Sequence, residues 1–310
     1  DNDFVKLILK FRSVSKLLNT YIDSLPKQIS KSTNRIHTNF LQTVAATGRL
    51  SSVNPNLQNI PIRTDSGKEI RKAFIPRNKD FFLMAADYSQ IELRVIAALS
   101  KEDNMIRSFE KNEDIHLSTA ATVFNIPLEK VTKQQRSHAK IVNFGIIYGV
   151  SAFGLSNQTD LNIKESKNLI DTYYEKYPKL KQFIEKQISF ARDKGYVETI
   201  LGRRRVLRDI NSSNGIIKSA AERNAVNAPI QGSAADIIKM SMINIQKAFI
   251  SKKIKSKMLL QIHDELVFDV FKPELNQVME IVRYQMENVF KLDVPLSVDI
   301  NYGVNWLEAH

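Results

Sequence analysis

Two short segments of this sequence contain the acidic residues that are best suited to phosphoryl chemistry. Asp87 directly follows an apolar run, and the pair Asp264-Glu265 lies far along the chain. Carboxylates from two such segments can hold a pair of divalent cations, which neutralise charge on a phosphate and activate an attacking hydroxyl. Mg²⁺ suits this arrangement because it usually takes only one or two carboxylates from a protein. Each aspartate alone is more typical of a turn, so a metal site is a hypothesis.

A third feature is a stripe of cations and rings on one predicted helix. Thr132 followed by Gln135 is a capping box, which predicts a helix start. The stripe residues then recur every four positions and share one slowly winding face: Arg136, Lys140, Phe144 and Tyr148. The cations lie toward the N-terminal end, where the helix dipole favours phosphate, and the rings could stack on a base. An ordinary solvated face has the same pattern. Gly145 and Gly149 follow the rings and predict a close approach of backbone or base.

The apolar periodicity predicts the first elements that position these residues. Apolar side chains at spacings of three and four predict an amphipathic helix over 4–22, which Pro26 ends. The run 81–86 predicts a buried strand that carries Asp87 at its end. A helix is expected to begin near Ser89.

The second half of the chain is expected to complete the same sheet. Residues 101–250 are mostly helical in pattern, while 257–270 predicts a hairpin whose tight connection contains His263 and Asp264. A last strand is predicted near 298–303. Strands near both ends with helices between them indicate an α+β protein with a helical insertion.

The bulk properties favour a globular protein that binds polyanions. The chain has 310 residues, 43% of them hydrophobic, and a net charge of +12 with a pI near 9.6. A surface this basic attracts nucleic acid, although many proteins are simply basic. The chain has no cysteine, which excludes disulfides and thiol nucleophiles. No apolar run approaches the length of a membrane span, so we expect a cytoplasmic chain with no membrane partner. We also expect a monomer.

Three segments together resemble the family A DNA polymerases, and the likeness extends over nearly all of the chain. They are DYSQIELR at 87–94, RSHAKIVNFGIIYG at 136–149 and HDE at 263–265. The resemblance implies a right-hand polymerase fold with an antiparallel palm sheet, a large helical fingers insertion and a partial helical thumb. The implied domains are the remainder of the thumb at 1–30, the palm at 31–100 and 235–310, and the fingers at 101–234.

The resemblance also implies roles for the acidic segments. Asp87 and Asp264 match the family's two metal-binding aspartates, the backbone carbonyl of Tyr88 would also reach metal, and Glu265 would be a supporting carboxylate. The expected cofactor is a pair of Mg²⁺ ions, for which Mn²⁺ could substitute. Glu92 would lie under the sugar of the incoming nucleotide and exclude a 2′-hydroxyl. Ser89 to Glu92 also reads as a capping box, which needs no function.

The remaining family motifs match contacts to nucleotide and DNA. Arg136 and Lys140 would contact the triphosphate, and Lys140 would protonate the departing pyrophosphate. Phe144 would pack against the sugar and Tyr148 would occupy the template-base position. Further nucleotide contacts would be His116 and Gln90, and the primer-template contacts would be Arg49, Asn56, Gln58, Asn59, Arg223, Asn227, Gln231 and His263. Asn56 to Asn59 also fits an ordinary turn.

The predicted function is therefore DNA-templated DNA synthesis, with primer-template DNA and deoxynucleoside triphosphates as partners. The chain begins abruptly within a helix, so we expect a fragment from which most of the thumb and the upstream exonuclease domains are missing. Two alternatives are a non-catalytic fragment that binds primer-template and a two-metal nuclease. A nuclease would have no use for the stripe from Arg136 to Tyr148.

Overall fold

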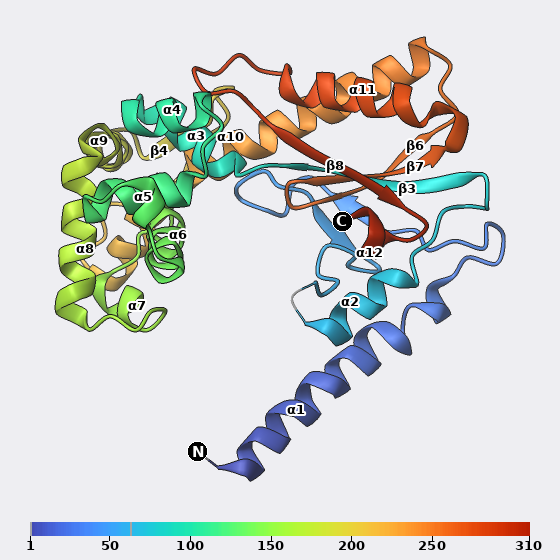
Figure 1. Cartoon of the computed structure of the whole chain (residues 1–310), viewed down its shortest axis with the longest axis horizontal. Helices are drawn as coiled ribbons and strands as arrows, with labels where there is room; N and C mark the ends of the chain where they lie inside the picture. Colours follow the sequence, from blue (N-terminus) through green and yellow to red (C-terminus); the bar gives the residue numbers. More distant parts are fainter. Residues whose placement is uncertain (1, 63) are drawn as a thin grey trace. The chain divides into compact units, whose positions relative to one another are not determined.

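The computed structural model describes residues 2–62 and 64–310. The chain forms two compact units (Figure 1). The sheet unit contains residues 1–87, 242–285 and 298–310, and the helical unit contains residues 88–241 and 286–297. Within the described residues, no helix is both long and apolar enough to cross a bilayer.

A four-stranded sheet is the centre of the sheet unit, and its strand order is β6-β7-β3-β8. Its strands are β3 (Phe81–Tyr88), β6 (Lys257–Ile262), β7 (Glu265–Phe271) and β8 (Val298–Gly303). The predicted strand at 81–86, the predicted hairpin and the predicted last strand are therefore confirmed. β7 is antiparallel to both β6 and β3, and its register places Glu265 opposite Asp87.

The alternation of side chains along β7 builds a core on each face of the sheet. Val267 belongs to a buried cluster that also contains Trp306 and Tyr21. The next residue, Phe268, points to the other face and packs against Phe249 of the long helix α10 (Gly215–Ser251), with ring centroids 6.1 Å apart. Burial on both faces fixes the strand register, because a slip of one residue would exchange the two faces.

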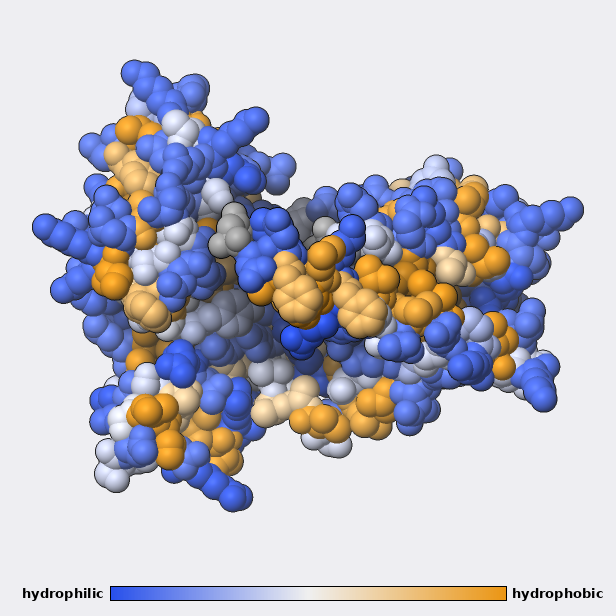
Figure 2. Space-filling model, turned by 90° about the horizontal axis from the view of Figure 1, so that it is seen from below, coloured by the Kyte–Doolittle hydropathy of each residue, from blue (hydrophilic) through white to orange (hydrophobic). Residues whose placement is uncertain are grey.

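The other elements of the sheet unit are short, apart from the helices α1 and α11. They are α1 (Asp3–Leu17), a π-helical turn (Leu18–Ile22), a 3₁₀ turn (Pro26–Gln28), β1 (Asn39–Leu41), β2 (Ser51–Val53), α2 (Asp65–Lys72), a second 3₁₀ turn (Lys272–Glu274), α11 (Leu275–Glu287) and α12 (Trp306–Ala309). The predicted helix over 4–22 is confirmed, but it ends before Pro26, which begins the next turn. Its apolar side chains are exposed (Figure 2), with Phe11 71% accessible.

The helical unit contains most of the remaining helices. They are α3 (Ile91–Ser100), α4 (Asp103–Glu110), α5 (Ile115–Phe124), a 3₁₀ turn (Leu128–Lys130), α6 (Lys133–Ile147), α7 (Ala152–Ser156), α8 (Ile163–Lys176), α9 (Pro178–Lys194) and the first part of α10. A small hairpin of β4 (Tyr196–Glu198) and β5 (Arg204–Val206), which the sequence did not predict, follows α9.

The two predicted capping boxes have different outcomes. The box at Thr132 is confirmed, because its hydroxyl accepts from the Gln135 amide while the Gln135 side chain returns to the Thr132 amide. The box at Ser89 is wrong. Helix α3 begins after Gln90, which is left-handed with φ 54° and makes no side-chain cap. The Glu92 carboxylate accepts a hydrogen bond from the distant Tyr148 hydroxyl.

A buried glutamate joins the starts of two helices in the helical unit. Glu102 is 2% exposed, and its Oε2 accepts hydrogen bonds from the amides of Lys179 (3.0 Å) and Leu180 (3.3 Å) at the start of α9. We expect Glu102→Ala to lower the free energy of unfolding by about 2–3 kcal/mol, since two amides at the start of α9, one of them buried, lose their acceptor. Urea denaturation measures this, with exposed Glu110→Ala as the control. An equal effect in the control would contradict the assignment.

Candidate nucleotidyl-transfer site

The sheet register brings the two predicted aspartates together. Asp87 is the penultimate residue of β3, and Asp264 lies in the turn immediately before β7, one residue from the position that pairs with Asp87. The turn is tight because His263 adopts the left-handed conformation, with φ 51°. Arg49 Nη2 lies 3.7 Å from the Asp264 carboxylate. Two carboxylates therefore share one end of the sheet.

Glu265 is close to the pair but is held by other groups. It is 3% exposed, and its Oε1 accepts a hydrogen bond from Trp306 Nε1 at 3.0 Å. Its Oε2 lies 3.2 Å from His310 Nδ1 and 3.9 Å from Arg71 Nη1. Among the described residues, no group of three or more His, Asp or Glu side chains is arranged to hold a metal. The donor set is therefore a pair of aspartates with a third carboxylate fixed beside them.

Burial, together with the nearby negative charges, raises the pKa of Asp87 to about 7. The largest cause is burial, followed by repulsion from Asp264 and then from Glu265, while His310 partly offsets it. A dication at this position would relieve both the desolvation and the repulsion. The residues therefore fit a divalent metal that is held by two carboxylates and otherwise by water and substrate.

The raised pKa predicts a dependence of stability on pH in the absence of metal. A carboxyl whose pKa is higher in the folded chain favours folding while it is protonated, and this contribution is lost as pH rises from about 4 through 7. We expect Asp87→Asn to be more stable than the parent by about 2 kcal/mol at pH 8, with little difference at pH 4.

Urea unfolding in EDTA measures the difference between Asp87→Asn and the parent. Asp299→Asn is a suitable control because Asp299 is exposed and contributes least to the raised pKa of Asp87. Added divalent cation should reverse the order by stabilising the parent. A gain from Asp87→Asn that stays constant between pH 4 and pH 8 would contradict the electrostatic explanation.

In the helical unit, the predicted stripe lies on one accessible face of α6. The opposite face supplies the buried side chains, which include Ala139, Val142 and Ile146. Lys140 is exposed, and Tyr148, which caps the helix, is 42% accessible. The stripe is therefore surface that can bind a ligand, and the core is built from the other side of the helix.

The first cation of the stripe is held by a carboxylate. Arg136 Nε and Nη2 donate to Asp114 Oδ2 at 2.8 and 2.6 Å. Asp114 also caps α5, because its Oδ1 accepts from the amides of His116 and Leu117. Partial burial would raise the pKa of Asp114, but the hydrogen bonds from Arg136 and from the two amides lower it. The ion pair keeps Arg136 at the start of the stripe.

The last ring of the stripe is tied to a buried glutamate. The Tyr148 hydroxyl donates to Glu92 Oε2 at 2.8 Å, and Glu92 is 6% exposed.

Gly149 follows with φ 68°, and an added Cβ there would lie 2.6 Å from Arg223 Cγ. An added Cβ at Gly145 would lie 2.7 Å from Val150. The expectation that these glycines admit a backbone or base needs correction, because protein side chains make the close approach.

His116 lies beside the stripe on α5. Its ring centroid is 5.6 Å from that of Phe144. Burial lowers the pKa of His116 to about 4, and Arg136 and Lys140 act in the same direction against the opposing effect of Asp114. The imidazole is therefore neutral at physiological pH.

The predicted primer-template residues occupy both units. Gln58 accepts from the Ser52 amide at 3.1 Å and donates to Gln261 O at 3.1 Å, so its side chain already has protein partners. Asn56 accepts from the Gln58 amide, as expected for the turn alternative. Four of the predicted primer-template residues are exposed: Asn56, Asn59, Arg223 and His263. Asn227 and Gln231 are half-buried on α10, and Gln90 is half-buried at the start of α3.

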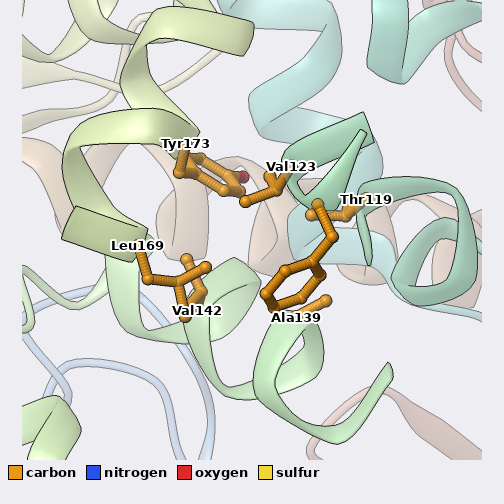
Figure 3. Close-up of a pocket in the computed structure, with 7 residues that line it drawn as sticks. Thr119, Val123, Ala139, Val142, Leu169 and Tyr173 are labelled. Atoms are coloured by element: carbon orange, nitrogen blue, oxygen red, sulfur yellow. The ribbon is translucent and has the colours of Figure 1, made fainter. Parts of the chain in front are cut away.

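The pocket drawn in Figure 3 is lined neither by the acidic residues at the end of the sheet nor by the stripe of α6. It is lined by Thr119, Val123, Phe124, Ala139, Val142, Leu169 and Tyr173, which come from α5, α6 and α8 (Figure 3). Almost all of this lining is apolar, so the pocket is a packing gap within the helical unit. The candidate sites are accessible surfaces rather than enclosed cavities.

Sequence reasoning missed two side chains in this region. Asp114 was not named as the partner of Arg136, although its position before α5 marks it as a helix cap. Asn143 was not singled out either. It is 1% exposed and forms hydrogen bonds with three neighbouring side chains. A polar residue on the buried face of a helix was the available signal.

Comparison with known proteins gives a consistent result. A family model described as DNA polymerase family A matches residues 1–308. The DNA polymerase I of Streptococcus pneumoniae (strain ATCC BAA-255 / R6) is 50% identical over 306 residues, which is 98% of this chain and 35% of that protein. The Bacillus subtilis (strain 168) DNA polymerase I is 46% identical over 308 residues, 99% of this chain and 35% of that protein.

A solved structure extends the comparison to the fold. The structure described as the POL domain of Pol1 from M. smegmatis, in complex with DNA primer-template and dNTP, superposes with a TM-score of 0.94 at 44% identity. The match covers 99% of this chain and 54% of that one. The chain spans about a third of the length of the curated relatives that it matches.

Proposed function

The chain belongs to DNA polymerase family A, and on that premise we propose that it adds deoxynucleotides to a primer 3′-end on a DNA template and releases pyrophosphate. The observation that carries the proposal is the accessible stripe of α6. Its two cations, Arg136 and Lys140, precede two rings, and its last ring holds a buried glutamate. Such a surface suits a nucleoside triphosphate and has no use in a nuclease.

The sheet unit is proposed to supply the metal site. Asp87 and Asp264 hold the divalent cations with the backbone carbonyl of Tyr88, and Mg²⁺ is the expected ion, with Mn²⁺ as a substitute. Cations bound by these residues would lower the pKa of the primer hydroxyl and neutralise charge on the triphosphate. Glu265 supports this arrangement, because its contacts with Trp306 and His310 fix a negative charge beside the two aspartates.

The helical unit is proposed to bind the nucleotide. Arg136, Lys140 and His116 contact the triphosphate, and Lys140 protonates the departing pyrophosphate. Phe144 packs on the sugar, and Tyr148 lies at the template-base position. Glu92 excludes a 2′-hydroxyl, since its carboxylate is buried and held by Tyr148. The backbone turn at Gln90 positions Glu92.

Primer and template are proposed to contact neutral donors and arginines from both units. Minor-groove acceptors are alike for every base pair, so donors aimed at them hold any correct duplex without reading sequence. The proposed contacts are Arg49, Asn56, Gln58, Asn59, Arg223, Asn227, Gln231 and His263. Gln58 acts mainly by positioning, given its bonds to Ser52 and Gln261. The basic charge of the chain adds affinity that falls with salt. We further propose that the chain works as a monomer in the cytoplasm.

Extension of a labelled primer on a DNA template, with all four deoxynucleotides and Mg²⁺, tests the proposal. Lengthening of the primer supports it, and shortening would indicate a nuclease. Binding without any change in length would indicate a non-catalytic fragment. The same reaction in EDTA is the control, because polymerisation must stop when the cations are removed.

A further inference from the structure

We propose that Asn143 is a positioning residue that fixes the tautomer of His116, so that the imidazole presents Nε2–H to a bound triphosphate. The inference rests on the proposed function, because it takes His116 to be a phosphate contact. It gives a role to Asn143, a buried residue that faces away from the stripe and that sequence reasoning did not select.

The geometry between the two side chains sets which ring nitrogen carries the proton. Asn143 Nδ2 lies 3.1 Å from His116 Nδ1, and both residues are buried. An amide nitrogen always carries hydrogens and cannot accept, so the bond forms only when Nδ1 is unprotonated. A neutral imidazole whose Nδ1 accepts must carry its hydrogen on Nε2.

Contacts from α5 and α8 fix the orientation of the Asn143 amide. The Tyr173 hydroxyl of α8 donates to Asn143 Oδ1 at 3.0 Å, and Tyr173 is 1% exposed. Asn143 Nδ2 also lies 3.0 Å from Thr119 Oγ1 on α5, which in turn accepts from Tyr177 at 3.4 Å. A flipped amide would place NH₂ against the Tyr173 hydroxyl and leave that buried proton without its acceptor. Figure 3 shows Tyr173 and Thr119 at the edge of the neighbouring pocket.

The outer nitrogen of the ring remains available for a ligand. Among the residues that the structure describes, none forms a hydrogen bond with His116 Nε2. The charged groups around the ring are Asp114, Arg136 and Lys140, and together with burial they lower the pKa of His116 to about 4. His116 therefore stays a neutral donor across the neutral range and adds no charge to the two cations of the stripe.

Replacing Asn143 by Asp reverses the polarity of this contact. A carboxylate accepts but does not donate, so it draws the ring proton to Nδ1 and raises the pKa of His116. At low pH the doubly protonated ring still donates from Nε2. At high pH the neutral ring carries its proton on Nδ1 and turns a bare nitrogen toward the phosphate. A tautomer effect therefore produces a new pH dependence of nucleotide binding.

The test combines nitrogen NMR with the KM for deoxynucleotide in primer extension. In parent protein labelled with ¹⁵N-histidine, we expect His116 to show a protonated Nε2 and a bare Nδ1. The KM of the parent should be flat between pH 6 and pH 8.5. In Asn143→Asp it should rise about tenfold at pH 8.5 relative to the parent and recover toward pH 6, as expected for one lost hydrogen bond to a charged acceptor.

His116→Gln supplies the matched background, since a glutamine amide can donate to phosphate and has no tautomer. In that background Asn143→Asp should change KM little at either pH. Tyr173→Phe is the milder variant in case Asn143→Asp folds poorly. Loss of the hydroxyl should release the amide orientation and give a mixture of His116 tautomers.

Each possible failure has a distinct signature. A protonated Nδ1 in the parent would overturn the inference directly. An equal KM rise from Asn143→Asp in the His116→Gln background would mean that Asn143 acts only through packing. If His116→Ala leaves KM unchanged, then the phosphate contact assigned to His116 in the proposed function is wrong, whatever the tautomer. Thermal unfolding of every variant separates these results from loss of the fold.

Discussion

Asp264→Asn is expected to slow primer extension by at least about 10³-fold while leaving primer-template affinity nearly unchanged. The substitution keeps the volume of the side chain but removes one of the two carboxylates at the end of the sheet. Charge stabilisation by a bound cation contributes several kcal/mol to a transition state, and each 1.4 kcal/mol is about a tenfold change in rate. Single-turnover extension and a separate binding titration measure the two quantities.

Asp299→Asn is the matched control for Asp264→Asn, because it removes a carboxylate of the same unit that is exposed on β8. It should extend primers within about twofold of the parent, as expected for a surface substitution outside the reaction site. Normal extension by Asp264→Asn would contradict the metal site. A parallel fall in primer affinity would instead mean that Asp264 positions DNA, and its contact with Arg49 would then be the relevant one.

Glu92→Ala is expected to raise the use of ribonucleotides relative to deoxynucleotides by about 10²-fold. The carboxylate is 6% exposed and is held by the Tyr148 hydroxyl at 2.8 Å, so it cannot move aside for an added hydroxyl group. Truncation opens space of about the size of that hydroxyl, and one well-placed group changes discrimination by about 10–200-fold. The ratio of kcat/KM for a ribonucleotide and its deoxynucleotide counterpart is the measurement.

Tyr148→Phe distinguishes two effects of Glu92: the space that its side chain fills, and the hydrogen bond that holds it in place. The variant keeps the ring and the carboxylate but removes the hydrogen bond between them, so we expect a smaller relaxation of about threefold to tenfold. Exposed Glu129→Ala is the control and should leave the ratio unchanged. If Glu92→Ala discriminates against ribonucleotides as well as the parent does, then Glu92 only supports Tyr148, and other residues exclude the 2′-hydroxyl.

The parts of the fold that the sequence predicts are those where local pattern and tertiary packing agree. The apolar run that becomes β3 and the second strand of the predicted hairpin, β7, are buried on both faces, so their apolar pattern is strong. The three-residue strands β4 and β5 give no such pattern and were missed. The domain boundaries inferred from the resemblance stay a proposal, while the compact units divide the chain after Asp87, Ser241, Gln285 and Ser297.

The two capping boxes show why the candidate site is harder to predict than the fold. Thr132 is exposed and Gln135 is half-buried, and hydrogen bonds between the two residues decide their conformation. At Ser89 the same sequence pattern fails, because Tyr148, far along the chain, takes the Glu92 carboxylate. Asn143 was missed for a similar reason, since its bonds depend on neighbours from α5 and α8. Roles set by distant partners leave little trace in local sequence.

The pairing of β3 with β7 also bears on how the protein is made. The two strands are separated by about 180 residues, and a ribosome adds about 5–20 residues per second. β3 therefore waits about 10–40 s for its partner, which is ample time for the helices between them to fold on their own core. During that interval the β3 edges are unpaired and open to wrong pairing. The acidic site is thus among the last features to form during synthesis, and slow or stalled translation near the hairpin would prolong the period of greatest aggregation risk.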